Sequence, residues 1–461
     1  MRLTFRATST MRIRSWLLAA PVALGLAACN SALDVAPSSS IPTATAITDA
    51  AGARAALTGA YAALQAGGLY YGGLVTFPEI ASDNGQFAGT LTSYADADHN
   101  AMHADNTQVA GIWDDSYAAI NRDNELLASV PTATGLSTTE RNEIMGEAYA
   151  LRALEYHNLV KLFGGVPLIL QPETSVAEAA KATRASVAQV YTQILSDLAQ
   201  AEKLITNTDQ TRQMSVGAAY AIEARVRLYQ GDWAGAEAAA AKVEAMGYSL
   251  DPDFSDLFSA NGSDTPEDIF RVIFTPAQYN EIGYYYLTKS LGGRYEVAPT
   301  ASIITAFDST SGGKIASYHP ANQRASASLG KSGSRAYAAR YATSIGAEHV
   351  HVIRFAEVIL IRAEALAHLG RLTEAVDELN LIRVRAGEAP QADTGRTQAD
   401  VLASIAAERR LELAFEGDRW PDLVRTGQAA SVLNIDPKMT LFPIPQREID
   451  TTPGLTQNPG Y

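Results

Sequence analysis

The fold class of this chain is decided by residues 216–246, which read VGAAYAIEARVRLYQ, then GD, then WAGAEAAAAKVEAM. The first and third parts are predicted helices, and the Gly231-Asp232 pair between them is a helix stop followed by a turn. Both helices carry small alanines, which let two paired helices approach closely: Ala221, Ala224 and Ala236. The stretch therefore predicts a helical hairpin.

A second hairpin of the same kind is predicted later in the chain. Residues 354–369 and 372–385 are separated by Gly370-Arg371, and alanines again lie on both helices. This succession of helix, short glycine turn and helix resembles tetratricopeptide repeats, whose units are about 34 residues long. A generic helical bundle with alanine-rich contacts would show the same periodicity. We expect a mainly α fold of tetratricopeptide-like hairpins, an α-α superhelix.

Four further helices are predicted nearer the N-terminus, where apolar residues recur at helical spacing. Glycine pairs and proline are expected to end them, as Gly164-Gly165-Val166-Pro167 does for one. The predicted helices cover residues 49–64, 112–130, 138–163 and 186–205.

Residues 247–349 break this helical pattern. The segment is rich in Gly, Ser, Tyr and Asn, and its one strand-like run lies at residues 269–274. An irregular segment of this length inside a compact fold is usually functional. We predict a large, loop-rich lobe with minor β structure.

The N-terminus has the three parts of an export signal. Four arginines form a basic leader, residues 16–26 are apolar, and Ala27-Ala28 is a small-residue cleavage site. The apolar run is far shorter than the ~20 residues of a spanning helix. Leu26-Ala27-Ala28-Cys29 resembles the lipobox of bacterial lipoproteins, so residues 1–28 are predicted to be a lipoprotein signal peptide. An ordinary signal cut after Ala28 is the alternative.

Cys29 is the only cysteine of the chain. This excludes an intrachain disulfide, a zinc finger and a cysteine nucleophile. The resemblance to lipoproteins implies a diacylglycerol on the Cys29 thiol, and two acyl chains anchor a protein stably in a membrane. Residues 29–42, which are rich in Ser, Ala and Pro, are then a lipid-anchored tether.

The composition is that of an acidic globular protein of 461 residues, with 47% hydrophobic and 19% charged residues. The net charge of the full chain is -14, and removal of residues 1–28, which hold four Arg and no acids, makes it -14 - 4 = -18. An acidic body argues against nucleic acid as a partner.

Several phrases, in chain order, point to one family. They are GEAYALRA (146–153) through FGGVPL (163–168), IRFAEVILIRAEA (353–365), LNLIRVRAG (379–387), ERRLELAFEGDRW (408–420), PIP (443–445) and QNPGY (457–461). This ordered set resembles the SusD/RagB family of nutrient-uptake outer-membrane lipoproteins. The matching phrases extend to Tyr461.

The resemblance implies a surface-exposed lipoprotein of the outer membrane that binds a nutrient without catalysis or cofactor. Such a protein captures an oligosaccharide, or less often a peptide, and acts as the lid of a SusC-like TonB-dependent barrel. The family organisation implies an N-terminal helical region at 43–246, the ligand lobe at 247–349 and a C-terminal helical region at 350–461. The helical hairpins would face the barrel.

Candidate ligand contacts follow from the chemistry of sugar recognition. An aromatic ring packs on the apolar face of a pyranose, while Asn, Asp, Gln and Arg bond its hydroxyls. For any single tyrosine, ordinary packing in the core is the alternative. The tryptophans at 113, 233 and 420 lie in helical segments assigned to the core, so no tryptophan is expected in the ligand site, and a peptide or a smaller ligand stays possible. The candidates are Tyr70, Tyr71, Asp83, Asn84 and Gln86 in the first loop region, and Tyr284, Tyr285, Tyr286, Arg294 and Tyr295 in the lobe.

Two other functions remain open at this stage. Glu408, Glu412 and Glu416 recur at a spacing of four residues beside Arg409 and Arg410, a pattern typical of ion pairs along and between helices. A pair such as Glu408 and Glu412 could instead serve a surface glycoside hydrolase as acid and base. A scaffold that binds only protein is the third possibility.

No metal site is predicted. Asp96, Asp98 and Asn100 occupy the first odd positions of a calcium loop, but Ala101 and Thr107 replace its required Gly and closing Glu. His99 and His103 are spaced for zinc only if the segment is helical and further ligands exist. Solvated loop residues are the simpler interpretation.

Overall fold

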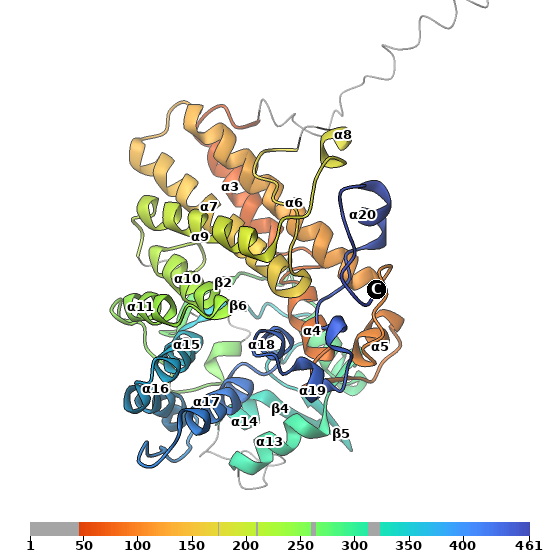
Figure 1. Ribbon diagram of the computed structural model, residues 1–461, viewed down its shortest axis with the longest axis vertical. Coiled ribbons are helices and arrows are strands. Elements are labelled where there is room, and N and C mark those ends of the chain that lie inside the picture. The colour runs from red at the N-terminus through yellow and green to blue at the C-terminus, as the bar shows by residue number, and fades with distance from the viewer. Residues whose placement is uncertain (1–45, 174, 209–210, 260–263, 312–322) are drawn as a thin grey trace, which may run out of the picture. The chain divides into compact units, whose positions relative to one another are not determined.

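Helices dominate the computed structural model, which describes residues 46–461 apart from 174, 209–210, 260–263 and 312–322 (Figure 1). The predicted signal peptide, Cys29 and the tether lie outside the described residues. Residues 47–461 form one compact unit. Within the described ranges, no helix is both long enough and apolar enough to cross a membrane.

The predicted N-terminal helices are confirmed and have polar caps. The side chains of Asp49, Asn106, Ser137 and Ser186 each accept a hydrogen bond from a backbone N–H of the helix that follows, and Ser186 forms a capping box with Gln189. The long central helix packs between its two neighbours and ends at Gly164, whose φ is +74°. These helices are α3 (Ala50–Ala63), α6 (Thr107–Ser129), α7 (Thr138–Phe163) and α9 (Val187–Leu204).

Both predicted hairpins are present. In the first, Gly231 adopts the left-handed conformation (φ +71°) that ends the first helix, and Asp232 caps the second. The alanines named above are fully buried, as expected for close helix packing. The hairpins consist of α10 (Val216–Gln230) with α11 (Trp233–Glu244), and of α15 (Phe355–His368) with α16 (Leu372–Arg385).

The hairpins stack into a superhelix. Helix α11 packs against α15, which also contacts α17 (Gln398–Glu412). At the α11–α15 contact, the Trp233 ring stacks on His368 with 3.8 Å between centroids and 8° between planes. The mainly α, tetratricopeptide-like architecture is therefore confirmed.

The segment 247–349 is built from short elements, as predicted. The strand-like run is β2, which pairs antiparallel with the strand that leads into α15, β6 (Val350–Arg354). The elements are η2 (Asp256–Phe258), β2 (Asp268–Val272), α12 (Ile282–Tyr286), η3 (Lys289–Leu291), β3 (Val297–Pro299), α13 (Ala301–Ser311), α14 (Gln323–Ser328), β4 (Leu329–Ser332) and β5 (Arg335–Ala338). Strands β4 and β5 form a hairpin.

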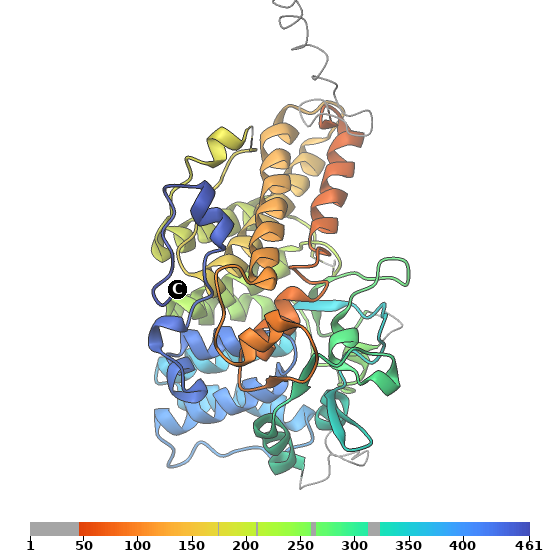
Figure 2. The ribbon, with the colours of Figure 1, turned by 90° about the vertical axis from the view of Figure 1, so that its right-hand side faces the viewer.

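The lobe also contacts the loop region near the N-terminus. Helices α4 (Gly73–Ile80) and α5 (Thr92–Asp98) lie beside the green and teal lobe in Figure 2. Between them, β1 (Gly85–Phe87) pairs antiparallel with β3. The Thr300 amide also donates to the Asn84 carbonyl at 2.9 Å. Two segments that are about 200 residues apart in the printed sequence thus form one surface.

The C-terminal segment returns to the long helix α7. Its short helices are α18 (Arg419–Arg425), α19 (Ala429–Leu433), η4 (Pro437–Met439) and α20 (Gln446–Thr451), while η1 (Val130–Thr132) and α8 (Val176–Ala179) occur earlier. The Asn458 side chain donates to the carbonyls of Phe163 and Phe442, and Trp420 is fully buried against Phe442. The QNPGY tail therefore closes the end of α7.

Candidate ligand-binding site

Four partly exposed tyrosines from the two predicted regions come together, and we call them the tyrosine cluster: Tyr71, Tyr279, Tyr284 and Tyr285. The Glu281 amide donates to the Tyr71 carbonyl at 3.0 Å, which joins the first loop region to the start of α12. The ring centroids lie 6.0 Å apart in the Tyr71–Tyr279 pair and 5.9 Å apart in the Tyr284–Tyr285 pair. The surface therefore presents two aromatic pairs around one acidic residue.

A buried aromatic layer supports this surface. The Tyr285 ring stacks on Tyr94 of α5, with centroids 5.5 Å apart and planes inclined by 20°. Tyr94 is itself buried, and its hydroxyl is 2.7 Å from the Thr76 hydroxyl of α4. Because its support is packed and hydrogen-bonded, the Tyr285 ring is held in place before any ligand arrives.

Glu281 sets the chemistry between the two aromatic pairs. Burial first, and then the negative charge of Glu281, raise the pKa of the Tyr71 hydroxyl above its usual range, and the same two causes raise the pKa of Tyr285 to about 12. Both hydroxyls therefore stay protonated at neutral pH and donate to the Glu281 carboxylate. The partly exposed Glu281 carboxylate supplies acceptors beside them.

Arg294 lies at the edge of the cluster, where a buried carboxylate holds it. Its Nε donates to Glu296 Oε1 at 2.5 Å, and Nη2 donates to the Thr90 hydroxyl at 3.1 Å. Glu296 is buried and also accepts from the amides of Thr90 and Leu91 at 2.8 and 2.9 Å. The guanidinium charge is thus balanced inside the protein, which favours an uncharged ligand.

Three candidates from the first loop bond other parts of the chain, two of them the C-terminal helices and one the lobe. Asp83 accepts from Arg419 at 2.7 Å and from Arg410 at 2.9 Å. Asn84 is buried, and its Oδ1 accepts from Arg410 at 2.9 Å. Gln86 is exposed but bonds the Pro299 carbonyl across the β1–β3 pair at 2.9 Å. Asp83 and Asn84 therefore have partners inside the protein, and they are not part of the tyrosine cluster.

Three of the candidate tyrosines lie in the core. Tyr70 is 6% exposed, and its hydroxyl accepts from Asn158 at 3.2 Å. Tyr286 is 1% exposed and packs edge-on against Phe415. Tyr295 is 8% exposed and donates to the Ala336 carbonyl at 2.7 Å. For these three, the packing interpretation fits the structure better than ligand contact.

The sequence reasoning missed Tyr279, Glu281 and Tyr94. Tyr279 and Glu281 lie in the same irregular segment as Tyr284, only a few residues earlier, so composition could have found them. Tyr94 gives no such signal, because its role depends on stacking with a residue about 190 positions later.

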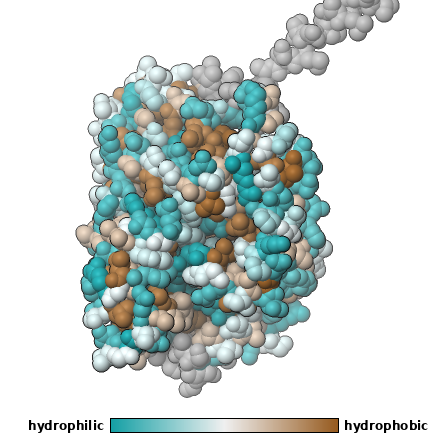
Figure 3. Space-filling view, in the orientation of Figure 1, coloured by the Kyte–Doolittle hydropathy of each residue, from teal (hydrophilic) through white to brown (hydrophobic). Residues whose placement is uncertain are grey.

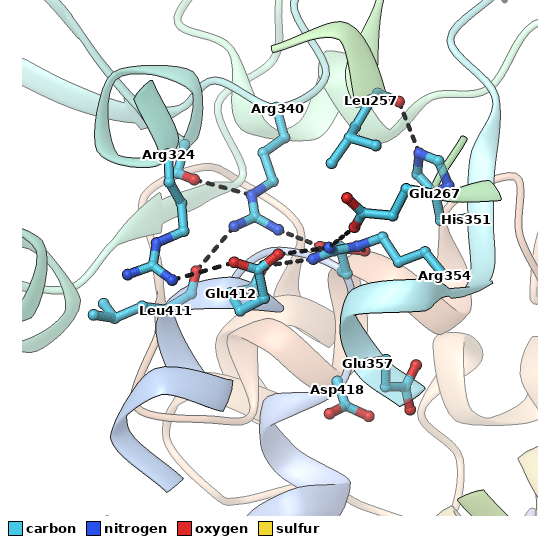
Figure 4. Close-up of polar contacts among 12 residues, drawn as sticks. Leu257, Glu267, Arg324, Arg340, His351, Arg354, Glu357, Leu411, Glu412 and Asp418 are labelled. Atoms are coloured by element: carbon cyan, nitrogen blue, oxygen red, sulfur yellow. Dashed lines mark hydrogen bonds and ion pairs between the residues drawn. The ribbon is translucent and has the colours of Figure 1, made fainter. Parts of the chain in front are cut away.

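Glu408 and Glu412 of α17 lie in a buried network that we call the ion-pair core: Glu267, Arg324, Arg340, Arg354, Arg385, Glu408, Glu412 and Glu416. Glu408 and Glu412 are 2% and 0% exposed. Arg324 Nη1 lies 2.5 Å from Glu408 and 3.2 Å from Glu412. Figure 4 shows the guanidinium groups of Arg324, Arg340 and Arg354 converging around Glu412.

Charge pairing in the ion-pair core keeps Glu412 ionised. Arg354 Nη1 lies 2.6 Å from both Glu267 and Glu412, and Arg385 also pairs with Glu412. The Glu412 pKa is held far below its usual range by these arginines, against the opposing effect of burial. A general acid needs a raised pKa and access to substrate, and Glu412 has neither.

No group of three or more metal-ligating side chains that could hold an ion occurs among the residues described. Asp98 and His99 form only a loose pair, with 3.9 Å between Nε2 and Oδ2 and the histidine side chain 69% exposed.

Comparison with known proteins agrees with this architecture. A family model described as "Starch-binding associating with outer membrane" matches residues 33–228, and the SusD family model matches residues 321–435. These matches cover much of both helical regions and define the chain as a SusD-type protein.

Relatives extend the likeness over nearly the whole chain. The SusD-like protein P38 of Formosa agariphila is 27% identical over 95% of this chain and 97% of its own length. A SusD superfamily structure from Bacteroides vulgatus is 24% identical, with a TM-score of 0.81 over 90% of this chain and 100% of that one. A laminarin-binding SusD-like protein is 26% identical, with a TM-score of 0.76 over the same shares. The chain belongs to the SusD/RagB family.

Proposed function

We propose that this protein is a surface nutrient-binding lipoprotein that captures an oligosaccharide on the tyrosine cluster and passes it to a TonB-dependent outer-membrane barrel. It acts as the lid of that barrel, with the hairpin superhelix toward the barrel and the lobe toward the ligand. The protein binds and does not catalyse.

One observation carries the proposal. Four partly exposed tyrosine rings, drawn from segments far apart in the chain, form two pairs, and one ring of each pair, Tyr71 and Tyr285, interacts with the Glu281 carboxylate. Ring faces suit the apolar face of a pyranose, and Glu281 and the tyrosine hydroxyls suit its hydroxyl groups. The similarity to a laminarin-binding structure makes a neutral glucan the first ligand to try.

A glycan panel tests the proposal. The mature protein is screened against laminarin and other neutral oligosaccharides, their sulfated counterparts and short peptides. We expect binding of a neutral glycan without product release, and a loss of about 30-fold in affinity, roughly 2 kcal/mol, in the Tyr71→Ala/Tyr284→Ala variant.

Tyr220→Ala is the matched control, because Tyr220 is a partly exposed tyrosine of α10 whose ring packs against the Lys242 ammonium instead of the cluster. Equal losses in the two variants, or no glycan binding by the wild type, would contradict the proposed site. Release of sugar products would contradict binding without catalysis.

Membrane attachment is tested separately. Cys29→Ala should leave folding and glycan affinity unchanged but should abolish stable anchoring, since no diacylglycerol could be attached. Membrane fractionation without the barrel partner measures this, and a variant that stayed membrane-bound would show that Cys29 is not the anchor.

A further inference from the structure

A wide groove lies away from the tyrosine cluster. It has a volume of about 760 Å³ and lies between α6, the segment after α7 and the C-terminal turn around α20. In Figure 1 these elements are the upper part of α6, the yellow segment near α8 and the dark blue α20. None of the candidate residues lines it. We call it the α6 groove.

The floor of the α6 groove is aromatic. Trp113 and Tyr117 lie one helical turn apart on α6, with ring centroids 5.0 Å apart. Tyr117 is fixed because its hydroxyl donates to the Pro167 carbonyl at 2.8 Å. The aliphatic side chains of Ile169 and Leu455 line the sides of the groove. Trp113 is only 3% exposed and so belongs to the core, as predicted, yet it also borders the groove.

The walls are polar, and their positive charges are already satisfied. Arg447 Nη2 lies 2.6 Å from Asp114 and 3.0 Å from Glu448. Arg122 donates to the Gly59 carbonyl at 2.6 Å. Four carboxylates line the groove against these two guanidinium groups, so an anionic ligand is disfavoured. Carboxylates accept hydrogen bonds, so a ligand rich in hydroxyl donors is favoured.

The shape favours a chain-like ligand. A second cavity of about 350 Å³ shares Ile169 and Ala182 with the α6 groove and extends it toward Gln189 at the start of α9. The α6 groove alone lies within the range of about 300–1,000 Å³ that is usual for small-ligand pockets, and the second cavity lengthens it. Figure 3 shows hydrophobic side chains scattered among hydrophilic ones on this face, without the continuous apolar patch of a stable protein interface.

We propose that the α6 groove is a second glycan site, which binds a linear, neutral oligosaccharide independently of the tyrosine cluster. This inference rests on the proposed function, because it adds a second contact for the same class of ligand. Two separate sites on one polymer would raise the overall avidity without any change in either site.

The test blocks the groove without removing any contact. Ala118 lines the groove and is exposed, so Ala118→Trp fills the space while the fold stays intact. Ala128→Trp is the matched control, because Ala128 is an exposed alanine of the same helix that does not line the α6 groove. Both substitutions are placed in the Tyr71→Ala/Tyr284→Ala background and in the wild type.

The probes are the neutral oligosaccharides of the panel and their sulfated counterparts, with affinities measured by calorimetry. We expect the tyrosine double variant to retain weak binding of a neutral oligosaccharide. Ala118→Trp should weaken that residual binding at least tenfold, and Ala128→Trp should leave it unchanged.

Each other outcome overturns the inference. If the tyrosine double variant binds no glycan, or if both tryptophan substitutions have the same effect, the groove is not a glycan site. The proposed site at the tyrosine cluster is tested separately, by the loss of affinity in its own variants. Preference for sulfated sugars would contradict the ligand class. If Ala118→Trp instead released a co-purified barrel and left glycan affinity intact, the groove would be a protein contact.

Discussion

The ion-pair core and the tyrosine cluster are both rich in polar side chains, yet they use them in opposite ways. In the ion-pair core, Glu412 is enclosed by Arg324, Arg354 and Arg385 and has no exposed surface. In the tyrosine cluster, Glu281 is partly exposed and bordered by rings. A carboxylate that is buried among internal partners stabilises the fold, whereas one that is partly exposed can still be reached by a ligand.

The largest expected effect comes from removing an arginine of the ion-pair core. Arg354→Ala leaves Glu267, Glu412 and Glu416 without their shared partner in a buried site. Breaking a buried pair in this way costs about 3–5 kcal/mol. Urea denaturation of the mature protein should show this loss, and a variant as stable as the wild type would mean that water reaches these carboxylates.

Glu155 gives a second test of the comparison, because it is as buried as Glu412 but, among the described residues, forms no ion pair with an arginine. Burial raises the Glu155 pKa to about 8, whereas the usual value is 4.5. The folded state therefore holds this proton more tightly than the unfolded state. Its contribution to stability is complete below pH 4.5 and falls as the pH rises through about 8.

Glu155→Gln should remove this pH dependence. Relative to the wild type, the variant should gain about 3 kcal/mol in unfolding free energy between pH 5 and pH 7, at about 1.4 kcal/mol per pH unit. Denaturation at both pH values measures it. Parallel stability curves for the two proteins would show that Glu155 is already ionised in the folded state.

On the side of the tyrosine cluster, Glu281→Gln should weaken glycan binding by about tenfold, roughly 1.4 kcal/mol, because a neutral amide replaces a charged acceptor. The melting temperature should barely change. Glu178→Gln on α8, an exposed carboxylate paired only with Lys181, is the control for charge alone. If calorimetry showed the same change in glycan affinity for Glu281→Gln and Glu178→Gln, Glu281 would not be a ligand contact.

The smallest effect is expected at an exposed ion pair. Arg371 is 41% exposed in the turn of the second hairpin and pairs with Glu374 and Glu237. Exposed pairs contribute little to stability because water and salt screen their charges, so Arg371→Ala should change the unfolding free energy far less than Arg354→Ala does. If the two variants lost similar amounts of unfolding free energy, the burial of an ion pair would not determine its contribution to stability.

The sequence predicted the helical hairpins well because their information is local. Apolar spacing and the Gly231-Asp232 turn depend on residues within a few positions of one another. The ion pairs expected near Glu408 are present, but several of their partners are remote. Arg324 lies 84 positions before Glu408 in the chain, and no periodicity in α17 indicates that contact.

The candidate site was predictable only in outline. The two loop regions do meet, yet Tyr70 and Tyr71 are neighbours with opposite outcomes, one buried and one partly exposed. Their segment follows no regular period, so the direction of each ring is set by tertiary packing on Asn158 or Tyr279. The same limit explains why Tyr279 was not predicted.

The ion-pair core also constrains how such proteins can be recombined. Arg324 and Arg340 belong to the irregular lobe, whereas Glu408 and Glu412 belong to α17. A chimera that joins the lobe of one relative to the helices of another must carry compatible arginines. Without them, buried carboxylates at the junction of lobe and helices would have no partner. New ligand specificity is therefore more easily engineered by changing rings in the tyrosine cluster than by exchanging whole lobes.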